Sequence, residues 1–362
     1  MLDLTSGAVL VAGGAGFIGS ALVRELLSAG IKTVCYDNYL HGHPENVATV
    51  PGPLTAVQAD ALDTTTLTRV IRDHEVHYLI SCVGDTFVPT AYALPARFFD
   101  VNLRATLNLL LTAIGTKIRR VLYLSSTEVY GNTAAAKISE DAPFDPVNTY
   151  AVSKLAADRL CSTLHREHGL PVVIARVFNC YGPRETHPYV IPDIISQLHR
   201  GSTLRLGNLE AERDLTYVHD TARALIAVLA SDIPNGDAVN VGSGTSFSVG
   251  WLARTLAGMM DRADVEIKHD PRRDRRCDVQ RFRCDNSKLR AFTGWRPRMD
   301  IGEGLRATVD WFRAHRARWS WEDVSQDVLP GDNRLTPLAP PDPDGTSLAN
   351  SLAAAPPARR TT

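Results

Sequence analysis

The sequence has 362 residues, of which 44% are hydrophobic and 22% are charged, a balance typical of a globular protein with one large domain or two smaller ones. The formal net charge of −1 gives no overall basic field, so we expect neither nucleic acid nor an anionic membrane surface as a partner. No apolar run approaches the ~18 residues of a membrane span, and the N-terminal segment "MLDLTSGAVLVAGG" lacks the features of a signal peptide.

The cysteines are scattered along the chain without a CxxC pair. They are Cys35, Cys82, Cys161, Cys180, Cys277 and Cys284. We interpret them as reduced thiols of a cytoplasmic protein, because neither a disulfide framework nor a zinc site matches this spacing.

The first half of the chain alternates short apolar runs with helical patterns. Strands are expected at 8–14, 32–37, 54–60, 77–83 and 119–126, and a helix at 20–30 follows the first of them. Strands that alternate with helices indicate right-handed βαβ units and a parallel sheet covered on both faces. The sequence therefore predicts a doubly wound α/β domain over residues 1–178.

After about Phe178 the pattern loosens. Helical stretches at 190–201, 220–230 and 249–260 are broken by short extended runs, which indicates a smaller, interleaved α/β lobe over residues 179–325. From about Pro330 the chain is rich in Pro, Ala and Asp, so we expect a disordered tail over 330–362.

The stretch "GGAGFIG" places Gly13, Gly16 and Gly19 between the first expected strand and the first helix. This context predicts a dinucleotide site, in which glycines permit a tight turn, approach of the pyrophosphate and close packing of helix on strand. Asp37 ends the second strand 18 residues after Gly19, where a carboxylate binds the ribose hydroxyls of NAD and repels the 2′-phosphate of NADP. Asp60 follows the third strand and either meets the adenine or caps a helix.

Tyr150 and Lys154 stand four residues apart in "NTYAVSKLAADRL", so they share one helix face. A cationic Lys154 and the positive nicotinamide would favour tyrosinate and lower the pKa of Tyr150. Such a tyrosine could accept a proton from an alcohol while hydride leaves for NAD.

Together with "SSTEVYG", "YDN", "ARVFNCYGPR", "RDLTYVHD", "NVGSG", "CDNSK" and "GWRPR", these motifs resemble the extended short-chain dehydrogenase/reductases of the nucleotide-sugar epimerase/dehydratase type. The resemblance runs from about residue 7 to about residue 315. It implies a seven-stranded Rossmann sheet, a C-terminal lobe that binds the nucleotide sugar, tightly held NAD, oxidation of the sugar at C4, and a homodimer.

Carried onto this sequence, the resemblance makes Tyr150 the base, Lys154 the ligand of the nicotinamide ribose, and Ser126, or Thr127 in the other register, the hydroxyl that binds the sugar O4. Asn179, Arg213 and an arginine of "RRDRRCD", assigned as Arg276, match contacts to the diphosphate, for which cations and hydrogen-bond donors are suited. The further cofactor contacts that it implies are Phe17, Ile18, Asn38, Ala61, Val83, Gly84 and Asn102.

The segment "ISCVGDTF" departs from the family pattern. Ser81 stands where relatives often carry His, while Val83 and Gly84 can still line the nicotinamide pocket. Thr86 and Asp85 are expected to face the substrate. The departure bears on the fit of the substrate more than on the oxidation.

Glu128 distinguishes the reactions that can follow C4 oxidation. A 4-epimerase needs no second base, whereas a 4,6-dehydratase must remove the C5 proton, which is α to the new carbonyl. A uronate decarboxylase also carries Glu at this place. "GNLEAERDLTYVHDT" and "CDNSK" resemble segments of 4,6-dehydratases, so we expect a dehydratase, with the epimerase, the decarboxylase and a merely structural Glu128 as alternatives.

Two other classes stay open. Some members of the superfamily keep the dinucleotide site but act as regulators or RNA-binding proteins, and these typically lose the Tyr–Lys pair. An oxidoreductase that releases free NADH is the other. Because Ser126, Tyr150 and Lys154 occur together, we expect a catalyst that retains its cofactor.

Overall fold

Seven parallel strands form the central sheet of the computed structural model, which describes residues 2–185, 187–275 and 277–315. Their order across the sheet is β10-β6-β5-β4-β1-β2-β3. The strands are β1 Ala8–Ala12, β2 Thr33–Asp37, β3 Leu54–Gln58, β4 Val76–Ser81, β5 Arg120–Ser126, β6 Val172–Val177 and β10 Ala238–Val241. Every neighbouring pair is parallel, as the βαβ pattern predicts.

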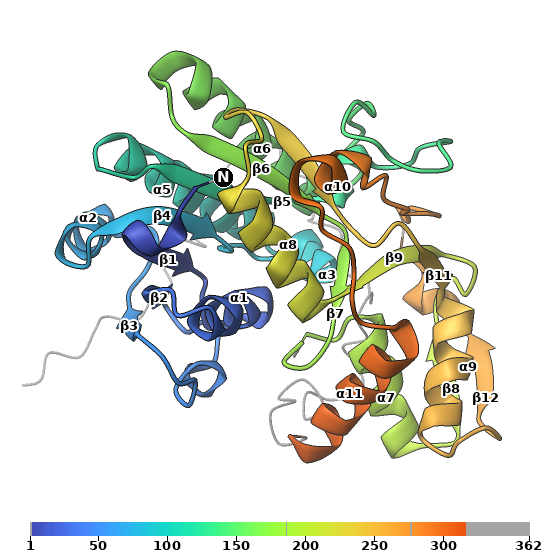
Figure 1. The fold of residues 1–362 in the computed structure, drawn as a ribbon. Helices are drawn as coiled ribbons and strands as arrows, with labels where there is room; N and C mark the ends of the chain where they lie inside the picture. The colour runs from blue at the N-terminus through green and yellow to red at the C-terminus, as the bar shows by residue number, and fades with distance from the viewer. Residues whose placement is uncertain (1, 186, 276, 316–362) are drawn as a thin grey trace, which may run out of the picture.

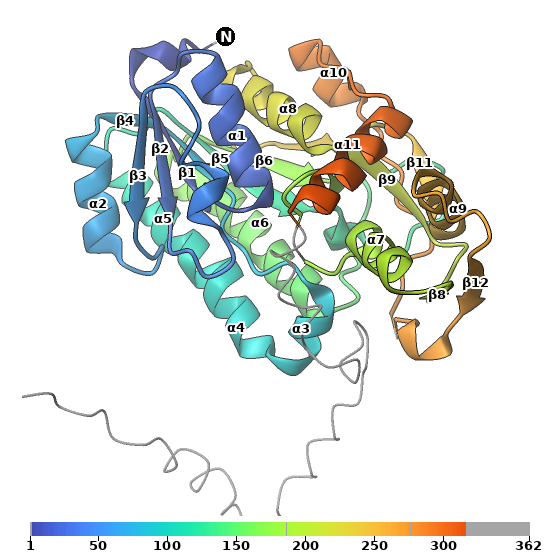
Figure 2. The same cartoon turned by 90° about the horizontal axis from the view of Figure 1, so that it is seen from below.

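Helices cover both faces of this sheet (Figures 1 and 2). The helices α1 Phe17–Ser28 and α8 Val218–Ala230 pack on one face, and α2 Thr64–Asp73, α5 Ala105–Ile114 and α6 Thr149–His168 pack on the other. Side chains of β1 alternate between the two cores: Val9 and Val11 point to the first, and Leu10 to the second. Burial on both faces explains why these strands are continuous apolar runs.

The C-terminal lobe is built on two small sheets. One has the order β11-β9-β7 and the other pairs β12 with β8. Its strands are β7 Asn179–Tyr181, β8 Thr203–Leu206, β9 Glu212–Tyr217, β11 Ser246–Ser248 and β12 Glu266–His269, and its helices are α7 Val190–Arg200, α9 Val249–Met259 and α11 Ile301–Ala314. These elements share a separate hydrophobic core.

Short elements complete the description. They are η1 Leu4–Ser6, η2 Pro44–Asn46, α3 Val88–Ala93, α4 Pro95–Phe99, the π-helical η3 Asp100–Arg104, η4 Thr127–Tyr130, η5 Pro271–Arg273 and α10 Ser287–Thr293. Helix α8 and strand β10 come late in the chain, yet α8 packs with α1 on the seven-stranded sheet and β10 is an edge strand of that sheet. The two lobes therefore interleave. The domain boundary at 178/179 stays a prediction, and the expected tail at 330–362 lies outside the described residues.

A buried ion pair fixes α6, the helix that carries Tyr150 and Lys154, to the sheet. Arg176 in β6 donates from Nε to Oδ2 of Asp158 over 2.9 Å and from Nη2 to Oδ1 over 3.1 Å. Both side chains are almost fully buried, at 4% and 0% exposure. Their bidentate geometry sets the position of α6 against β6.

Candidate active site

A cavity of about 410 Å³ lies between the two lobes and collects most of the residues expected to act. Its walls come from the glycine-rich turn, the ends of β4 and β5, the start of α6, and the C-terminal lobe. The predicted residues that line it are Gly13, Gly16, Phe17, Ile18, Gly19, Val83, Gly84, Thr86, Ser126, Thr127, Glu128, Tyr150, Lys154, Asn179 and Arg213.

The glycine-rich turn has the shape that a dinucleotide pyrophosphate requires. A Cβ on Gly19 would lie 1.9 Å from the carbonyl oxygen of Gly13, so only glycine allows this approach of helix to turn. Gly13 has φ +77°, which glycine adopts without strain. Gly16 begins α1 without a side-chain cap, and the first turn of α1 holds no acidic residue, so its N–H groups suit a phosphate. The residues present therefore fit NAD.

A second set of residues expected to bind the cofactor lies at the carboxyl ends of β2 and β3. Asp37 is buried, and its two oxygens accept hydrogen bonds from the backbone N–H of Ala15 (2.9 Å) and of Tyr39 (2.8 Å). A carboxylate has about four acceptor positions, so two remain for ribose hydroxyls. Asn38 donates to Asp60 over 2.9 Å, which places these two side chains beside each other.

The residues Asp37, Asn38, Asp60 and Ala61 do not line the main cavity, and their contacts to the cofactor stay predictions. The alternative role for Asp60 is wrong: helix α2 is capped by Asp63, whose Oδ1 accepts hydrogen bonds from Thr65 and Thr66.

Asn102 lies behind the cofactor pocket and does not line it. Its buried amide accepts a hydrogen bond from Asp85 N (2.8 Å) and donates to Asp85 O (3.0 Å) and to Ser153 Oγ (2.9 Å). With these partners, Asn102 fixes the segment after β4 to α6. The structure thus shows that Asn102 positions this segment, and its expected contact with the cofactor stays a prediction.

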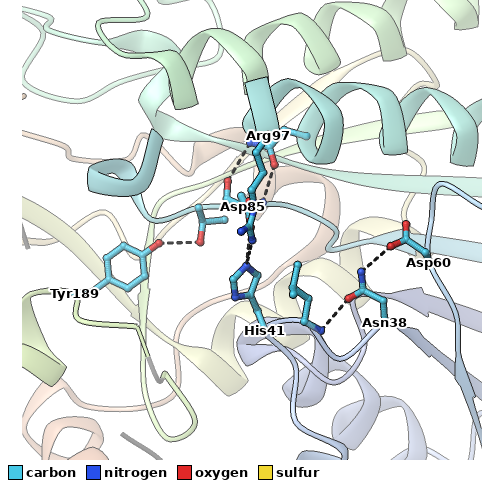
Figure 3. A network of polar contacts seen from close by, with 9 residues as sticks. Asn38, His41, Asp60, Asp85, Arg97 and Tyr189 are labelled. Atoms are coloured by element: carbon cyan, nitrogen blue, oxygen red, sulfur yellow. Dashed lines mark hydrogen bonds and ion pairs between the residues drawn. The ribbon is translucent and has the colours of Figure 1, made fainter. Parts of the chain in front are cut away.

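Asp85 also differs from expectation, because it does not line the cavity and its side chain points to Arg97 and His41 (Figure 3). It accepts hydrogen bonds from Arg97 Nε (2.6 Å) and pairs with His41 Nε2 (2.8 Å). Burial opposes ionisation of Asp85, but the hydrogen bonds from His41 and Arg97 outweigh it and lower the pKa of the carboxyl group. The network ties the loop after β2 to the segment after β4.

Tyr150 and Ser126 both line the cavity. Asn148 caps α6 by accepting a hydrogen bond from Ala151 N (2.8 Å), which places Tyr150 in the first turn of the helix. Burial raises the pKa of Tyr150, and a hydrogen bond with Ser126 opposes this rise only in part. The expectation that Lys154 lowers this pKa is therefore not met by the side chains alone.

The reason lies in the position of Lys154. Its ammonium group donates to the carbonyl oxygen of Leu124 and lies 4.7 Å from the centroid of the Tyr123 ring. Burial lowers the pKa of Lys154 to about 8. The expected effect of the positive nicotinamide on Tyr150 stays a prediction.

Glu128 faces the cavity on the short helix η4, whose start is capped by Ser126 Oγ (3.2 Å from Glu128 N). Asn148 Nδ2 donates to its Oε2 over 3.3 Å. The charge of Glu128 acts on both Tyr150 and Arg213, and all three residues line the same cavity. The hydroxyl of Thr127 is buried and has no hydrogen-bond partner among the described residues.

On the substrate side, Arg213 is held firmly. Its Nη2 donates to Asp278 Oδ1 over 2.9 Å and its Nη1 to the carbonyl oxygen of Val279 over 2.8 Å. Asn179 lines the same wall, and its buried amide oxygen has no partner within the described chain.

Arg276 lies outside the described residues. The neighbouring Arg275 lines the cavity, forms no ion pair with any described residue, and acts electrostatically on Arg213 and Tyr189. A one-residue change in the register of "RRDRRCD" would have selected Arg275.

A second missed group lies between β7 and α7, where the polar stretch "RETHPY" follows a strand end. Its described members Glu185, His187 and Tyr189 line the cavity. His187 and Tyr189 pack with Phe87 in an aromatic cluster, with ring centroids 5.5–6.1 Å apart. The position of this stretch after a strand was the available signal.

Comparisons with known proteins agree with this geometry. The family model described as GDP-mannose 4,6 dehydratase matches residues 10–308. A dTDP-glucose 4,6-dehydratase of Xanthomonas campestris pv. campestris (strain B100) is 30% identical over 347 residues, which cover 90% of this chain and 97% of the relative.

Two solved structures represent the two main reaction types. A dTDP-glucose 4,6-dehydratase of Streptomyces venezuelae with NAD bound superposes with a TM-score of 0.81 at 30% identity, covering 86% of this chain and 99% of that one. A UDP-glucose 4-epimerase of Thermotoga maritima gives a TM-score of 0.78 at 27% identity, covering 85% and 99%. The chain therefore belongs to the GDP-mannose 4,6-dehydratase family, within the NAD-dependent nucleotide-sugar epimerases and dehydratases of the extended short-chain dehydrogenase/reductases.

Proposed function

We propose that the protein is an NAD-dependent nucleotide-sugar 4,6-dehydratase, which converts an NDP-hexose into an NDP-4-keto-6-deoxyhexose and water. The observation that carries this proposal is the carboxylate of Glu128 in the cavity that Tyr150 also lines. A second base at this place serves an elimination and has no task in a simple 4-epimerisation.

In the oxidation, NAD supplies the acceptor for the C4 hydride and later the donor that returns it to C6. Ser126 hydrogen-bonds the sugar O4, and Tyr150 takes the O4 proton. Burial of Tyr150 excludes water from this proton transfer. Lys154 holds the nicotinamide ribose and keeps a positive charge behind the reacting groups.

In the elimination, Glu128 takes the C5 proton, which the new C4 carbonyl makes acidic. Asn148 orients the Glu128 carboxylate through its hydrogen bond to Oε2. Glu128 forms no ion pair with any described residue, so no cation competes with the substrate for its carboxylate.

The substrate class follows from the cations on the other wall. Arg213 and Arg275 present guanidinium groups, and Asn179 an amide, to a diphosphate between the sugar and the nucleoside. The named relatives act on dTDP-glucose, and we extend this to the class of nucleotide sugars.

The test is incubation of the protein and NAD with UDP-, GDP- and dTDP-hexoses in deuterated water, followed by mass spectrometry. We expect loss of one water with deuterium at C5. Glu128→Gln should lower this rate at least 100-fold, because removal of a positioned base typically costs 10²–10⁴. Glu303→Gln, an exposed carboxylate on α11, is the matched control and should not change the rate.

An isomer of unchanged mass, without deuterium, would identify a 4-epimerase and make Glu128 structural. Carbon dioxide release from an NDP-uronate would identify the decarboxylase. Either result would overturn the dehydratase proposal.

We also propose that the protein forms a homodimer through the outer faces of α5 and α6. The exposed apolar side chains in this part of the chain are Phe99 before α5, Leu111 and Ile114 on α5, and Val152 on α6. Leu111→Glu should convert the dimer into a monomer in light scattering. Phe292→Glu, at a similarly exposed position on α10, should not.

We further propose a cytoplasmic location, in keeping with six free thiols. Within the described residues no helix combines the length and the apolar character needed to cross a bilayer. Fractionation of cells that express the protein with a C-terminal tag would test this, and recovery outside the cytoplasm would contradict it.

A further inference from the structure

Glu185 is a buried carboxyl group of the cavity to which the mechanism above gives no task. It lies between β7 and α7, is 7% exposed, and lines the cavity. Its hydrogen bond within the described chain comes from the backbone N–H of His187 to Oε1, over 3.3 Å. A carboxyl group with so little support is unusual, because a buried carboxylate normally has a cation or several donors.

No described residue supplies Glu185 with a compensating positive charge. His187 is the nearest basic side chain in sequence among the described residues after it, and its ring stacks on Phe87 with centroids 6.1 Å apart. Burial, followed by the charge of His41, lowers the pKa of His187 to about 4, so the ring is neutral at pH 7. Burial raises the pKa of Glu185 to about 8, which leaves the group mostly protonated at neutral pH.

The neighbours of Glu185 connect it with the catalytic tyrosine. Tyr189 is hydrogen-bonded to Thr86 Oγ1 over 2.8 Å and lies next to the network drawn in Figure 3. Burial raises the pKa of Tyr189, and the charges of Glu185 and Tyr150 both act on its phenol. All three residues line the same cavity, Glu185 and Tyr189 from the C-terminal lobe and Tyr150 from the Rossmann lobe.

We propose that Glu185 is the acid that protonates the C6 hydroxyl of the sugar as it leaves as water. This inference rests on the proposed dehydratase function and names a residue for the step that Glu128 cannot perform while it holds the C5 proton. The residue beside Glu128, Thr127, carries a hydroxyl that is too weak an acid for this task.

The step balances without a further reagent. Glu185 gives its proton to the C6 oxygen, the C6–O bond breaks with its electron pair on the oxygen, and water leaves. The electrons of the C5–H bond form the C5–C6 double bond while Glu128 holds the C5 proton. The hydride removed from C4 then adds to C6, Glu128 delivers to C5 a proton that has exchanged with solvent, and the O4 proton taken by Tyr150 restores Glu185.

The experiment compares wild type with Glu185→Gln, using UDP-, GDP- and dTDP-glucose in deuterated water. We expect the variant to lose water at least 100-fold more slowly, while C4 oxidation and C5 exchange continue. Recovered substrate should carry deuterium at C5, and absorbance of the reduced nicotinamide should accumulate. Glu210→Gln, an exposed carboxylate of the same lobe, should behave as wild type.

Glu185→Asp keeps the acid with a shorter reach and should lose water faster than Glu185→Gln. Equal rates in these two variants would overturn the proposal, as would water loss by Glu185→Gln within twofold of wild type. Equal loss of C5 exchange and dehydration in Glu185→Gln would assign the residue to positioning and also overturn it. If wild type itself releases no water, the proposed function fails, which is distinct from failure of the variant alone.

Discussion

Lys154 combines its proposed catalytic role with a cost to stability, and this makes a sharp prediction. Burial lowers its pKa from 10.5 to about 8, so holding its charge inside the protein costs about 3 kcal/mol at pH 7. Replacement by Met removes this cost but also removes the hydrogen bond to the Leu124 carbonyl oxygen, worth about 1–3 kcal/mol. At pH 7 the Lys154→Met protein without cofactor should therefore be more stable by about 1 kcal/mol, although it is inactive.

The pH dependence follows from the direction of the shift. Between about pH 8 and 10.5 the unfolded chain binds more protons at this lysine than the folded protein does, so stability of the wild type rises with pH in this window. The higher stability of Lys154→Met relative to wild type should therefore disappear as the pH rises. Near pH 10 the variant should be the less stable protein, because the lost hydrogen bond then dominates.

Urea unfolding at pH 7 and pH 10, without NAD, measures both differences. Lys117→Met replaces an exposed lysine and should change neither value appreciably. Added NAD should stabilise wild type more than Lys154→Met. A Lys154→Met protein that is less stable than wild type by the same amount at both pH values would refute the reasoning.

Three further predictions concern the cofactor turn, the sheet and the substrate wall. Gly19→Ala should abolish retention of NAD through purification, because its Cβ would lie 1.9 Å from the Gly13 carbonyl oxygen; retained NAD would contradict this. Asp158→Ala should destabilise the fold by about 3–5 kcal/mol in urea unfolding, because it leaves Arg176 buried and unpaired; a loss below 1 kcal/mol would count against it. Arg275→Ala should raise KM at least tenfold with kcat nearly unchanged, and an unchanged KM would exclude contact with the diphosphate.

The cofactor turn and the catalytic pair could be predicted from the sequence because their spacing is local. Gly13, Gly16 and Gly19 lie within one short stretch of sequence, and Tyr150 and Lys154 lie on one helix face. The place of Ser126 and Glu128 could also be predicted from the sequence. Ser126 ends strand β5 and Glu128 follows it, and the carboxyl ends of parallel strands face the site.

The network of Asp85 could not be predicted in the same way. His41, Asp85 and Arg97 come from three segments, and the direction of the Asp85 side chain depends on where the two cations lie in space. The hydrogen bond of Lys154 could not be predicted from the sequence for a related reason. Sequence spacing places Lys154 on the same helix face, but the ammonium group bonds to Leu124, and burial then dominates the pKa of the tyrosine.

Glu185 escaped notice because nothing in its sequence neighbourhood marks it as buried. Burial raises its pKa, and the cavity that it lines is formed by segments of both lobes. Such an environment is a property of the folded cavity.

The central claim is that hydride leaves C4 and returns to C6 of the same sugar, with Glu128 serving the elimination between the two transfers. The most direct test uses an NDP-hexose deuterated at C4 in ordinary water, with the position of deuterium in the product read by NMR. We expect a 4-keto product that carries the deuterium in its C6 methyl group. Deuterium that remains at C4 of an isomerised hexose would contradict it.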